Sequence, residues 1–453
     1  MFRRLLWAGL FCPVAAIMAQ STIREAVDSA LARYPAIRIP VEQKAAAEAG
    51  ITLARTAYLP RVDFHTQLNR ATRNNIYGMI FPQTVIPPIS GPPNPENSMT
   101  NVWGSAVGIL VSWEPFDFGF RQARVGEAEA GRRRAESALE RTRLEVATRT
   151  ADSFLTILAA QQTVKAAAAG VERARVFSNV VEALVKADLR PGAELSRARA
   201  EAAMALAAQI QAEQAVAVAK ADLIQFTGAD PASVSVAAGP LLGETTGLET
   251  MSAIADAHPV LREQDSVIGE SQARQKTLDR SFFPKFQIQG AQYARGTGAR
   301  PDFTTGGAAS GLGPNIYNWG VAVGMTMPLM DFASIRAKKQ IESAGERTER
   351  ARYDQLRADL TARLERARAM LDGARRVAQV VPVQLEAARA AETQASARYK
   401  AGLGTLVEVA EAQRLLTQTE IDYSLARLAI WRGLLAVAAA QGDLEPFLKQ
   451  AGN

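Results

Sequence analysis

Residues 58–68 read Tyr-Leu-Pro-Arg-Val-Asp-Phe-His-Thr-Gln-Leu, and residues 282–289 follow the same plan as Phe-Phe-Pro-Lys-Phe-Gln-Ile-Gln. In both stretches a proline ends the preceding helical pattern, because its ring and its missing N–H oppose a helix. Apolar residues then alternate with polar ones, which is typical of a strand with one apolar and one polar face. The chain is therefore expected to pass from helix to amphipathic strand twice.

The two stretches belong to an internal duplication of the whole chain. Upstream, Tyr34-Pro35 and His258-Pro259 stand at equal distances from them, and downstream Trp103-Gly104 pairs with Trp319-Gly320. From Asp117 and Asp331 onwards the pairing continues without a gap to Gly228 and Gly442. We expect two structural repeats at residues 20–240 and 241–445, each with a helix, two strands, a long helix and a further helix, and then a C-terminal tail at 446–453.

The longest helices follow the second strand of each repeat. The segment from about Phe120 to Lys186 has no proline and is dominated by Ala, Glu, Arg and Leu. At 1.5 Å per residue, such a helix is about 100 Å long. The second repeat predicts a matching helix from about Ser334 to Tyr399, which Pro382 should bend or interrupt. Each long helix is followed by a turn, at 189–192 and 401–404, and by another helix.

The first residues are typical of a secretory signal peptide, expected at residues 1–19. Two arginines precede an apolar run and then small residues up to Ala19. A retained anchor helix is the alternative, but the run is short and Pro13 interrupts it. The only cysteine, Cys12, lies in this segment. The mature chain is therefore expected to have no disulfide, thiol catalysis or cysteine metal site.

Composition further narrows the class of protein to which the chain can belong. The 453 residues are 48% hydrophobic, and the mean hydropathy is −0.06. This value excludes a polytopic helical membrane protein, while the abundance of Ala, Leu, Val and Ile excludes a disordered chain. The net charge is +6, but arginines are spread along helices beside glutamates, so no nucleic-acid partner is expected.

Four amphipathic strands in an exported chain raise a physical problem. Their two faces suit lipid on one side and water on the other. An open sheet edge in hydrocarbon would leave backbone groups unpaired, and the smallest membrane barrels have about 8 strands. Strands pooled from two or three chains would close such a barrel, with 8 or 12 strands. The alternative is a soluble sandwich with helical appendages, which does not explain helices of about 100 Å.

The ordered motifs resemble those of the TolC-like outer-membrane efflux protein family over about residues 22–445. They are Tyr34-Pro35, Tyr58-Leu59-Pro60, Pro115-Phe116-Asp117-Phe118-Gly119, Pro328-Leu329-Met330-Asp331-Phe332, and Arg398-Tyr399-Lys400-Ala401-Gly402 ahead of Thr405-Leu406-Val407-Glu408-Val409. The resemblance implies a mainly α fold with a small β part. It implies a homotrimer with a 12-stranded β-barrel in the lipid of the bacterial outer membrane, continued by a long α-helical barrel in the periplasm.

The resemblance also implies a function. The chain would be the passive outer-membrane channel of a tripartite efflux or type I secretion system. A periplasmic adaptor protein would couple it to an inner-membrane transporter of RND, ABC or MFS type. The rival interpretation is an exported coiled-coil scaffold or adaptor-like protein without a pore, although such proteins lack four amphipathic strands in a duplicated frame.

In this family the two helix-turn-helix tips form the entrance and contact the adaptor. The matching residues here are Asp188, Arg190, Gly192 and Glu194 at the first tip, and Gly402, Gly404, Thr405 and Glu408 at the second. Because only the second tip keeps the Gly-x-x-Thr pattern, we predict that it is the better-preserved adaptor contact. Asp188, Glu194 and Glu408 are candidates for an acidic constriction, or are ordinary turn and first-turn acids favoured by the helix dipole.

Two further sets complete the predicted sites. The strand-to-helix junctions carry Pro115, Asp117, Pro328 and Asp331, and the barrel lumen face carries Asp63, His65, Gln67, Gln287 and Gln289. His65 and His258 have no sequence support for a metal cluster or a catalytic triad, and the Gly-rich stretch 296–313 lacks the Lys-Ser/Thr of a phosphate-binding loop. We therefore expect no catalytic residue, metal or cofactor, and no enzyme activity.

Overall fold

The computed structural model describes residues 21–75, 93–230, 235–243 and 257–452. The predicted signal peptide and most of the proline-rich loop lie outside these residues. The elements are α1 (Ile23–Arg33), α2 (Pro35–Thr56), β1 (Arg61–Thr72), β2 (Asn101–Phe116), α3 (Phe120–Lys186), α4 (Gly192–Thr227), η2 (Gly239–Leu242), α5 (Pro259–Arg280), β3 (Lys285–Thr297), β4 (Ile316–Thr326), α6 (Phe332–Lys400), α7 (Leu406–Gln441) and α8 (Glu445–Gly452).

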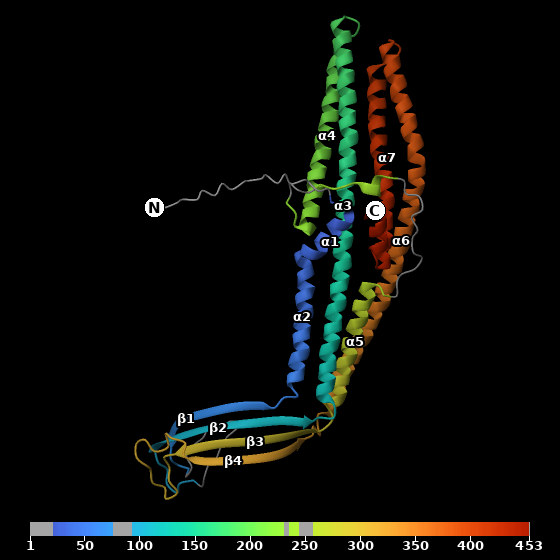
Figure 1. Cartoon of the computed structure of the whole chain (residues 1–453). Helices are drawn as coiled ribbons and strands as arrows, with labels where there is room; N and C mark the ends of the chain where they lie inside the picture. Colours follow the sequence, from blue (N-terminus) through green and yellow to red (C-terminus); the bar gives the residue numbers. More distant parts are fainter. Residues whose placement is uncertain (1–20, 76–92, 231–234, 244–256, 453) are drawn as a thin grey trace, which may run out of the picture. The chain divides into compact units, whose positions relative to one another are not determined.

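Corresponding elements of the two repeats have closely similar lengths. The long helices α3 and α6 have 67 and 69 residues, and α4 and α7 have 36 residues each. Figure 1 shows α3 with α4 and α6 with α7 as two helical hairpins. We call these the first hairpin and the second hairpin.

The chain divides into two compact units that cut across both repeats. The hairpin unit holds the described residues of Met1–Glu42, Glu136–Glu263 and Tyr353–Asn453, and the sheet unit holds those of Gln43–Ala135 and Gln264–Arg352. Each unit therefore draws segments from both halves of the sequence.

The core of the hairpin unit lies around the second half of α7. Trp431 and Leu434 of α7 and Phe154 and Leu158 of α3 belong to one buried cluster. Phe447 of α8 joins the same cluster and is 3% exposed. Within the described chain, α7 alone has the length and composition of a membrane-spanning helix, but 56% of that apolar window is buried in this packing. Its apolar character therefore serves the core.

The sheet unit contains one antiparallel sheet in the order β1-β2-β3-β4, shown in Figure 1. Its register aligns Phe64 with Ile109, and Val111 with Gly290, which in turn aligns with Val321. The apolar face is exposed, as the side-chain exposures of Phe64 (65%) and Val321 (69%) show. Large exposed apolar faces mark a surface that contacts lipid or another chain.

The structure refines the expectations about helices. The single helix expected ahead of the first strand is two helices, α1 and α2, because Tyr34, just before Pro35, adopts the extended conformation at φ −63° and ψ 123°. Helix α6 is not interrupted at Pro382; Pro382 is exposed, while Leu385 and Ala388 are buried beside Leu416 of α7 and hold the helix in place. The C-terminal tail expected from residue 446 contains helix α8 (Glu445–Gly452), which packs into the core.

Candidate entrance site at the hairpin tips

The two hairpin tips have the same backbone. At the first tip the N–H of Asp188 donates to the carbonyl of Val185 at 3.0 Å, and the N–H of Leu189 to that of Leu184 at 2.9 Å. At the second tip, Gly402 and Leu403 donate in the same way to Tyr399 and Arg398, at 3.0 and 2.9 Å. This pair of bonds is the Schellman motif, which ends a helix with one residue at positive φ.

The residue at positive φ is Asp188 in the first tip, with φ 56°, and Gly402 in the second, with φ 78°. Aspartate adopts this conformation more readily than most residues, because its short polar side chain can bond locally. The absence of glycine at this position in the first tip therefore does not change the turn. Positive φ therefore does not distinguish the two tips, and the better-preserved adaptor contact at the second tip remains a prediction.

The tips differ in how the following helix begins. Thr405 caps α7, and its Oγ1 accepts a hydrogen bond from the N–H of Glu408 at 3.3 Å. Pro191 occupies the matching place before α4 and makes no side-chain cap. Just before Thr405, a Cβ at Gly404 would lie 3.2 Å from Cβ of Arg398 and from Oε2 of Glu408. The second tip is therefore packed within its own hairpin.

The first tip instead reaches across to the second hairpin. The guanidinium carbon of Arg190 lies 4.8 Å from the ring centroid of Tyr399, and Nη2 donates to the carbonyl of Tyr399 at 3.3 Å. Tyr399 Oη donates to Oε2 of Glu194 at 2.6 Å, and Glu194 Oε1 lies 3.7 Å from Arg190 Nη1. We call these three residues the tip lock.

The tip lock rests on an apolar cluster shared by both hairpins. Tyr399 is 1% exposed and packs edge-on against Phe177 of α3, with ring centroids 5.1 Å apart. Val181 and Val409 belong to the same cluster. Burial and the neighbouring Glu194 carboxylate raise the pKa of Tyr399 to about 12, so its hydroxyl remains a donor at neutral pH.

The other predicted tip residues lie apart from the lock. Glu408 Oε2 lies 4.0 Å from Nε of Arg398, on its own hairpin. Asp188 and Gly192 are exposed at the first tip, and no ion pair of Asp188 is recorded in the described part of the chain. Between Asp188 and Gly192, Leu189 is 68% exposed, and its counterpart Leu403 is 73% exposed. Each tip thus presents a leucine at the same turn position.

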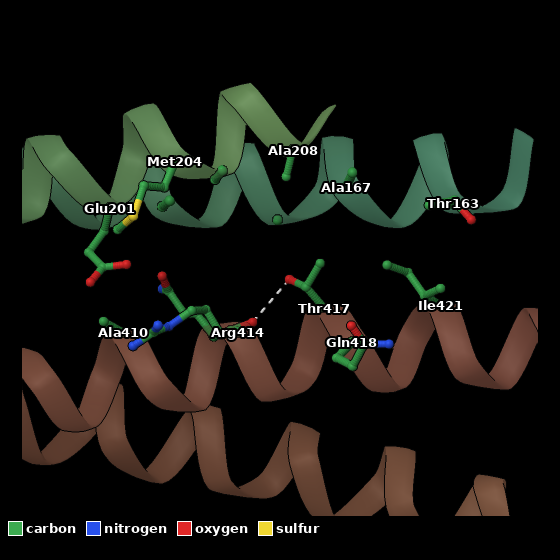
Figure 2. A pocket seen from close by; sticks show the side chains of 14 residues that line it. Thr163, Ala167, Glu201, Met204, Ala208, Ala410, Arg414, Thr417, Gln418 and Ile421 are labelled. Atoms are coloured by element: carbon green, nitrogen blue, oxygen red, sulfur yellow. Dashed lines mark hydrogen bonds between the residues drawn. The ribbon is translucent and has the colours of Figure 1, made fainter. Parts of the chain in front are cut away.

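Behind the tips, the hairpins touch at discrete points. A Cβ at Gly170 of α3 would lie 2.8 Å from Oγ1 of Thr417 of α7. Arg173 pairs with Glu420 at 2.9 Å. Beside this contact lies a cavity of about 390 Å³ between α3, α4 and α7 (Figure 2), lined largely by small side chains, with Met204 and Ile421 among its apolar residues. The hairpins are therefore not packed continuously along their length.

The predicted junction residues differ between the repeats. Asp117 is buried, and its Oδ2 accepts from both the backbone N–H and Nε of Arg121, each at 2.8 Å. Asp331 is exposed, and Ile335 stands where the first repeat has Arg121. Pro115 lies within β2 at a register irregularity, and Pro328 lies between β4 and α6.

The five predicted lumen residues share one face of the sheet. The register places Asp63, His65 and Gln67 opposite Leu110, Gly108 and Ala106, and places Gln289 opposite Ser112 on the same face. Gln287 falls on this face by the two-residue period of β3. Asp63 pairs with Arg61 at 2.9 Å.

Sequence reasoning missed Tyr399 as a functional candidate, although it quoted the residue within a motif. Its partners lie in the first hairpin, more than 200 residues away, so spacing along the chain gave no signal. Within the described residues, no group of three or more His, Cys, Asp or Glu side chains is placed to hold a metal ion.

Known proteins match this chain over nearly its full length. The family model "Outer membrane efflux protein" matches residues 26–229 and 252–443. Protein CyaE of Bordetella pertussis is 25% identical over 425 residues, which are 93% of this chain and 84% of that protein. These matches do not favour the rival scaffold without a pore.

Solved structures share the fold at low identity. The Campylobacter jejuni CmeC outer membrane channel has 15% identity and a TM-score of 0.72, covering 93% of this chain and 85% of that one. The Neisseria gonorrhoeae MtrE outer membrane channel, in its open state, has 16% identity and a TM-score of 0.72, covering 93% and 89%. Both structures support the mainly α fold with a small β part that forms a β-barrel continued by an α-helical barrel.

Channels of this family form trimers and act with periplasmic adaptors and inner-membrane transporters. The chain belongs to the outer membrane efflux protein family, and it is an outer-membrane channel for efflux or secretion whose helices extend into the periplasm.

Proposed function

We propose that the two tips of each chain, repeated around the trimer axis, form the constricted periplasmic entrance and contact the adaptor. The single observation that carries this proposal is the shared tip backbone with an exposed leucine at the same position, Leu189 and Leu403. An adaptor that meets one tip would meet equivalent geometry at the next. Repeated around the trimer axis, these leucines would form a contiguous apolar patch, which is typical of an interaction surface.

Crosslinking tests the adaptor contact. A photoreactive residue at position 189 or 403 of the full-length trimer should capture the adaptor with comparable yield from both positions. A matched control at Arg199, which lies on α4 and pairs with Glu182, should give little product. Capture at one tip only would contradict equivalent contacts, and equal capture at the control would contradict a tip contact.

The tip lock is proposed to keep the entrance narrow. It joins the end of α6 to the first tip by one cation–π contact, one hydrogen bond from Tyr399 to the Glu194 carboxylate, and one from Arg190 to the Tyr399 carbonyl. Hydrogen bonds to charged groups contribute about 1.5–3 kcal/mol each. The cavity behind the lock interrupts the packing between the hairpins, so release of the lock and of the apolar cluster around Tyr399 would let the hairpin ends separate.

Asp188 and Glu408 are proposed as the acidic groups of the entrance. Glu194 is engaged in the lock, whereas Asp188 is exposed. Glu408 contacts only residues of its own hairpin in the described chain: its Oε1 accepts from Thr405 Oγ1 at 3.3 Å, and its Oε2 lies 4.0 Å from Arg398 Nε. Single-channel recordings of Asp188→Ala and Glu408→Ala should show reduced block by divalent cations. Unchanged conductance and block in both variants would remove this role and leave ordinary turn acids.

The sheet is proposed to close with two other copies into a 12-stranded barrel. Its exposed apolar face would meet lipid, and the face with Asp63, His65, Gln67, Gln287 and Gln289 would line the lumen. Cysteine variants at Phe64 and His65 offer a matched pair for labelling. A lipid-soluble quencher should reach position 64, and a water-soluble reagent should reach position 65; the reverse would contradict the assignment.

The energy for transport is proposed to come from the inner-membrane transporter, of RND, ABC or MFS type, and not from chemistry in this chain. Support comes from the family, whose members are channels, and from the passive character of a β-barrel lumen. Co-purification of the crosslinked adaptor with its transporter identifies the type. Hydrolysis of a nucleotide by the purified trimer alone would contradict the proposal.

A further inference from the structure

One buried imidazole joins the start of α5 to the end of α7. His258, just before α5, is 2% exposed. Its Nδ1 accepts a hydrogen bond from the backbone N–H of Val260 at 3.2 Å, and its Nε2 lies 3.4 Å from the carbonyl oxygen of Ala439. An accepting Nδ1 carries no proton, so the ring is the neutral tautomer with its proton on Nε2. The same ring therefore caps α5 and reaches the last turn of α7.

The end of α7 is shaped to receive this ring. Gly442 ends the helix with φ 87°. A Cβ at Gly442 would lie 2.7 Å from Cδ2 of His258 and 2.9 Å from Cδ of Pro259. Glycine is needed here both for the left-handed conformation and for the close approach of the imidazole.

The first repeat builds the matching joint without a histidine. Tyr34 stands where the second repeat has His258, and its ring packs on Phe226 with centroids 5.3 Å apart. Gly228, the counterpart of Gly442, also has positive φ, but a Cβ there would meet nothing within 4 Å. Tyrosine does not titrate near neutral pH, so only the joint of the second repeat contains a group that can charge in mild acid.

The surroundings oppose a charged imidazole. Burial lowers the pKa of His258, and the positive charge of Arg363 on α6 acts in the same direction, against the opposing effect of the Ala439 carbonyl. Among the described residues, two carboxylates of these elements are engaged elsewhere. Asp443, next to Gly442, accepts from the N–H of Glu445 at 2.9 Å, and Glu263 of α5 pairs with Arg141 of α3. Arg262 adds a second positive side chain on the first turn of α5.

We propose that His258 is an acid-released latch: neutral, it fastens the start of α5 to the end of α7, and protonated, it lets them part in the second repeat only. Protonation of Nδ1 removes the acceptor for the Val260 N–H. It also places a positive charge at the N-terminus of α5, where the helix dipole is unfavourable to cations. The inference is independent of the entrance proposal, because it concerns neither tip.

The direction of the pH effect on the stability of the joint follows from the lowered pKa of His258. The folded joint binds a proton less readily than the unfolded chain, so its stability is constant above a pH of about 6.5 and falls as the pH drops below that. The joint therefore weakens in acid and is unaffected by alkali in this range.

Hydrogen exchange of the full-length trimer in detergent tests the latch. Between pH 7.5 and pH 5.0, after correction for intrinsic exchange rates, the amides of residues 260–263 should lose protection. Residues 36–39, at the matching joint of the first repeat, serve as an internal control and should keep their protection. A parallel loss at both joints, or at neither, would overturn the proposal.

Variants make the test specific to the imidazole. In His258→Asn the side-chain oxygen can still accept from the Val260 N–H, but it does not titrate, so the pH dependence at 260–263 should vanish. His258→Gln provides a second non-titrating side chain if the Asn variant does not assemble. His65→Asn removes the only other histidine and should retain the wild-type response. An unchanged pH response in the His258 variants would contradict the latch.

Discussion

The two hairpin tips share their turn geometry but differ in what their side chains contact. In both, two backbone hydrogen bonds and one residue at positive φ reverse the chain. The second tip uses Gly404 and Thr405 to pack and cap within its own hairpin, whereas the first tip uses Arg190 to reach Tyr399 of the other hairpin. The backbone hydrogen bonds therefore determine the turn at both tips. The side chains differ: those of the second tip cap the following helix, and those of the first tip link the two hairpins.

The largest expected effect comes from removing the ring that both tips share. Tyr399→Ala would lose a buried aromatic side chain and leave a cavity, at a cost of about 3–5 kcal/mol. Because Phe177 and Val181 pack on this ring, hydrogen exchange should speed up at both tips. Tyr399→Phe keeps the ring and removes only the hydroxyl, so it should lose about 1.5–3 kcal/mol. Equal losses in the two variants would show that packing contributes nothing beyond the hydroxyl.

Substitutions at the residue with positive φ give the next largest effect, and they change the stability of the two tips in opposite directions. Gly402→Ala places a Cβ in the left-handed region and should destabilise the second tip by about 1–2 kcal/mol. Asp188→Gly relieves the same conformation and should stabilise the first tip by less than about 1 kcal/mol. Exchange of the amides of Leu403 and Leu189, which close the two turns, reports each effect locally. Changes of the same sign at both tips would contradict the shared geometry.

The helix cap gives a smaller difference. Thr405→Ala removes the acceptor for the N–H of Glu408 and should cost about 1 kcal/mol. Pro191→Ala at the matching position removes no cap and serves as the control. Exchange of the first-turn amides of α7 and α4 measures both. If the two variants lose equal protection, the difference in capping is not real.

The smallest expected effect is the ionisation of Tyr399 in the tip lock, which leaves the lock unchanged at neutral pH. Since the pKa of Tyr399 is raised to about 12, the lock should be fully present below about pH 10 and weaken only as the pH rises towards 12. Ultraviolet difference titration of wild type against Tyr399→Phe isolates this tyrosinate. Ionisation of Tyr399 near pH 10, the value of an unperturbed tyrosine, would contradict its burial beside Glu194.

Much of the fold could be predicted because it depends on local patterns. The alternation after Pro60 and Pro284 located β1 and β3, and the absence of proline located α3 between Phe120 and Lys186, as observed. Pro382 does not interrupt α6, where Leu385 and Ala388 pack beside Leu416, and the bend predicted there remains a prediction. The C-terminal helix α8 was missed because eight residues carry little periodic signal.

The contacts of the tip lock could not be predicted from the sequence, for a different reason. Which side chain of one hairpin faces which of the other depends on how the helices pack, and Arg190 and Tyr399 are far apart in the chain. Gly402 has positive φ, which glycine permits, but Asp188 adopts the same conformation, so the absence of a glycine does not exclude such a turn.

Single-channel conductance in a planar bilayer tests the central claim most directly, since the tips are proposed to narrow the entrance and the lock to hold them. The account predicts that the double variant Arg190→Ala/Tyr399→Phe conducts more than wild type, and that the control Arg199→Ala, which breaks only an exposed pair with Glu182, conducts as wild type. An unchanged conductance in the double variant, with hydrogen exchange showing that the lock is broken, would contradict it.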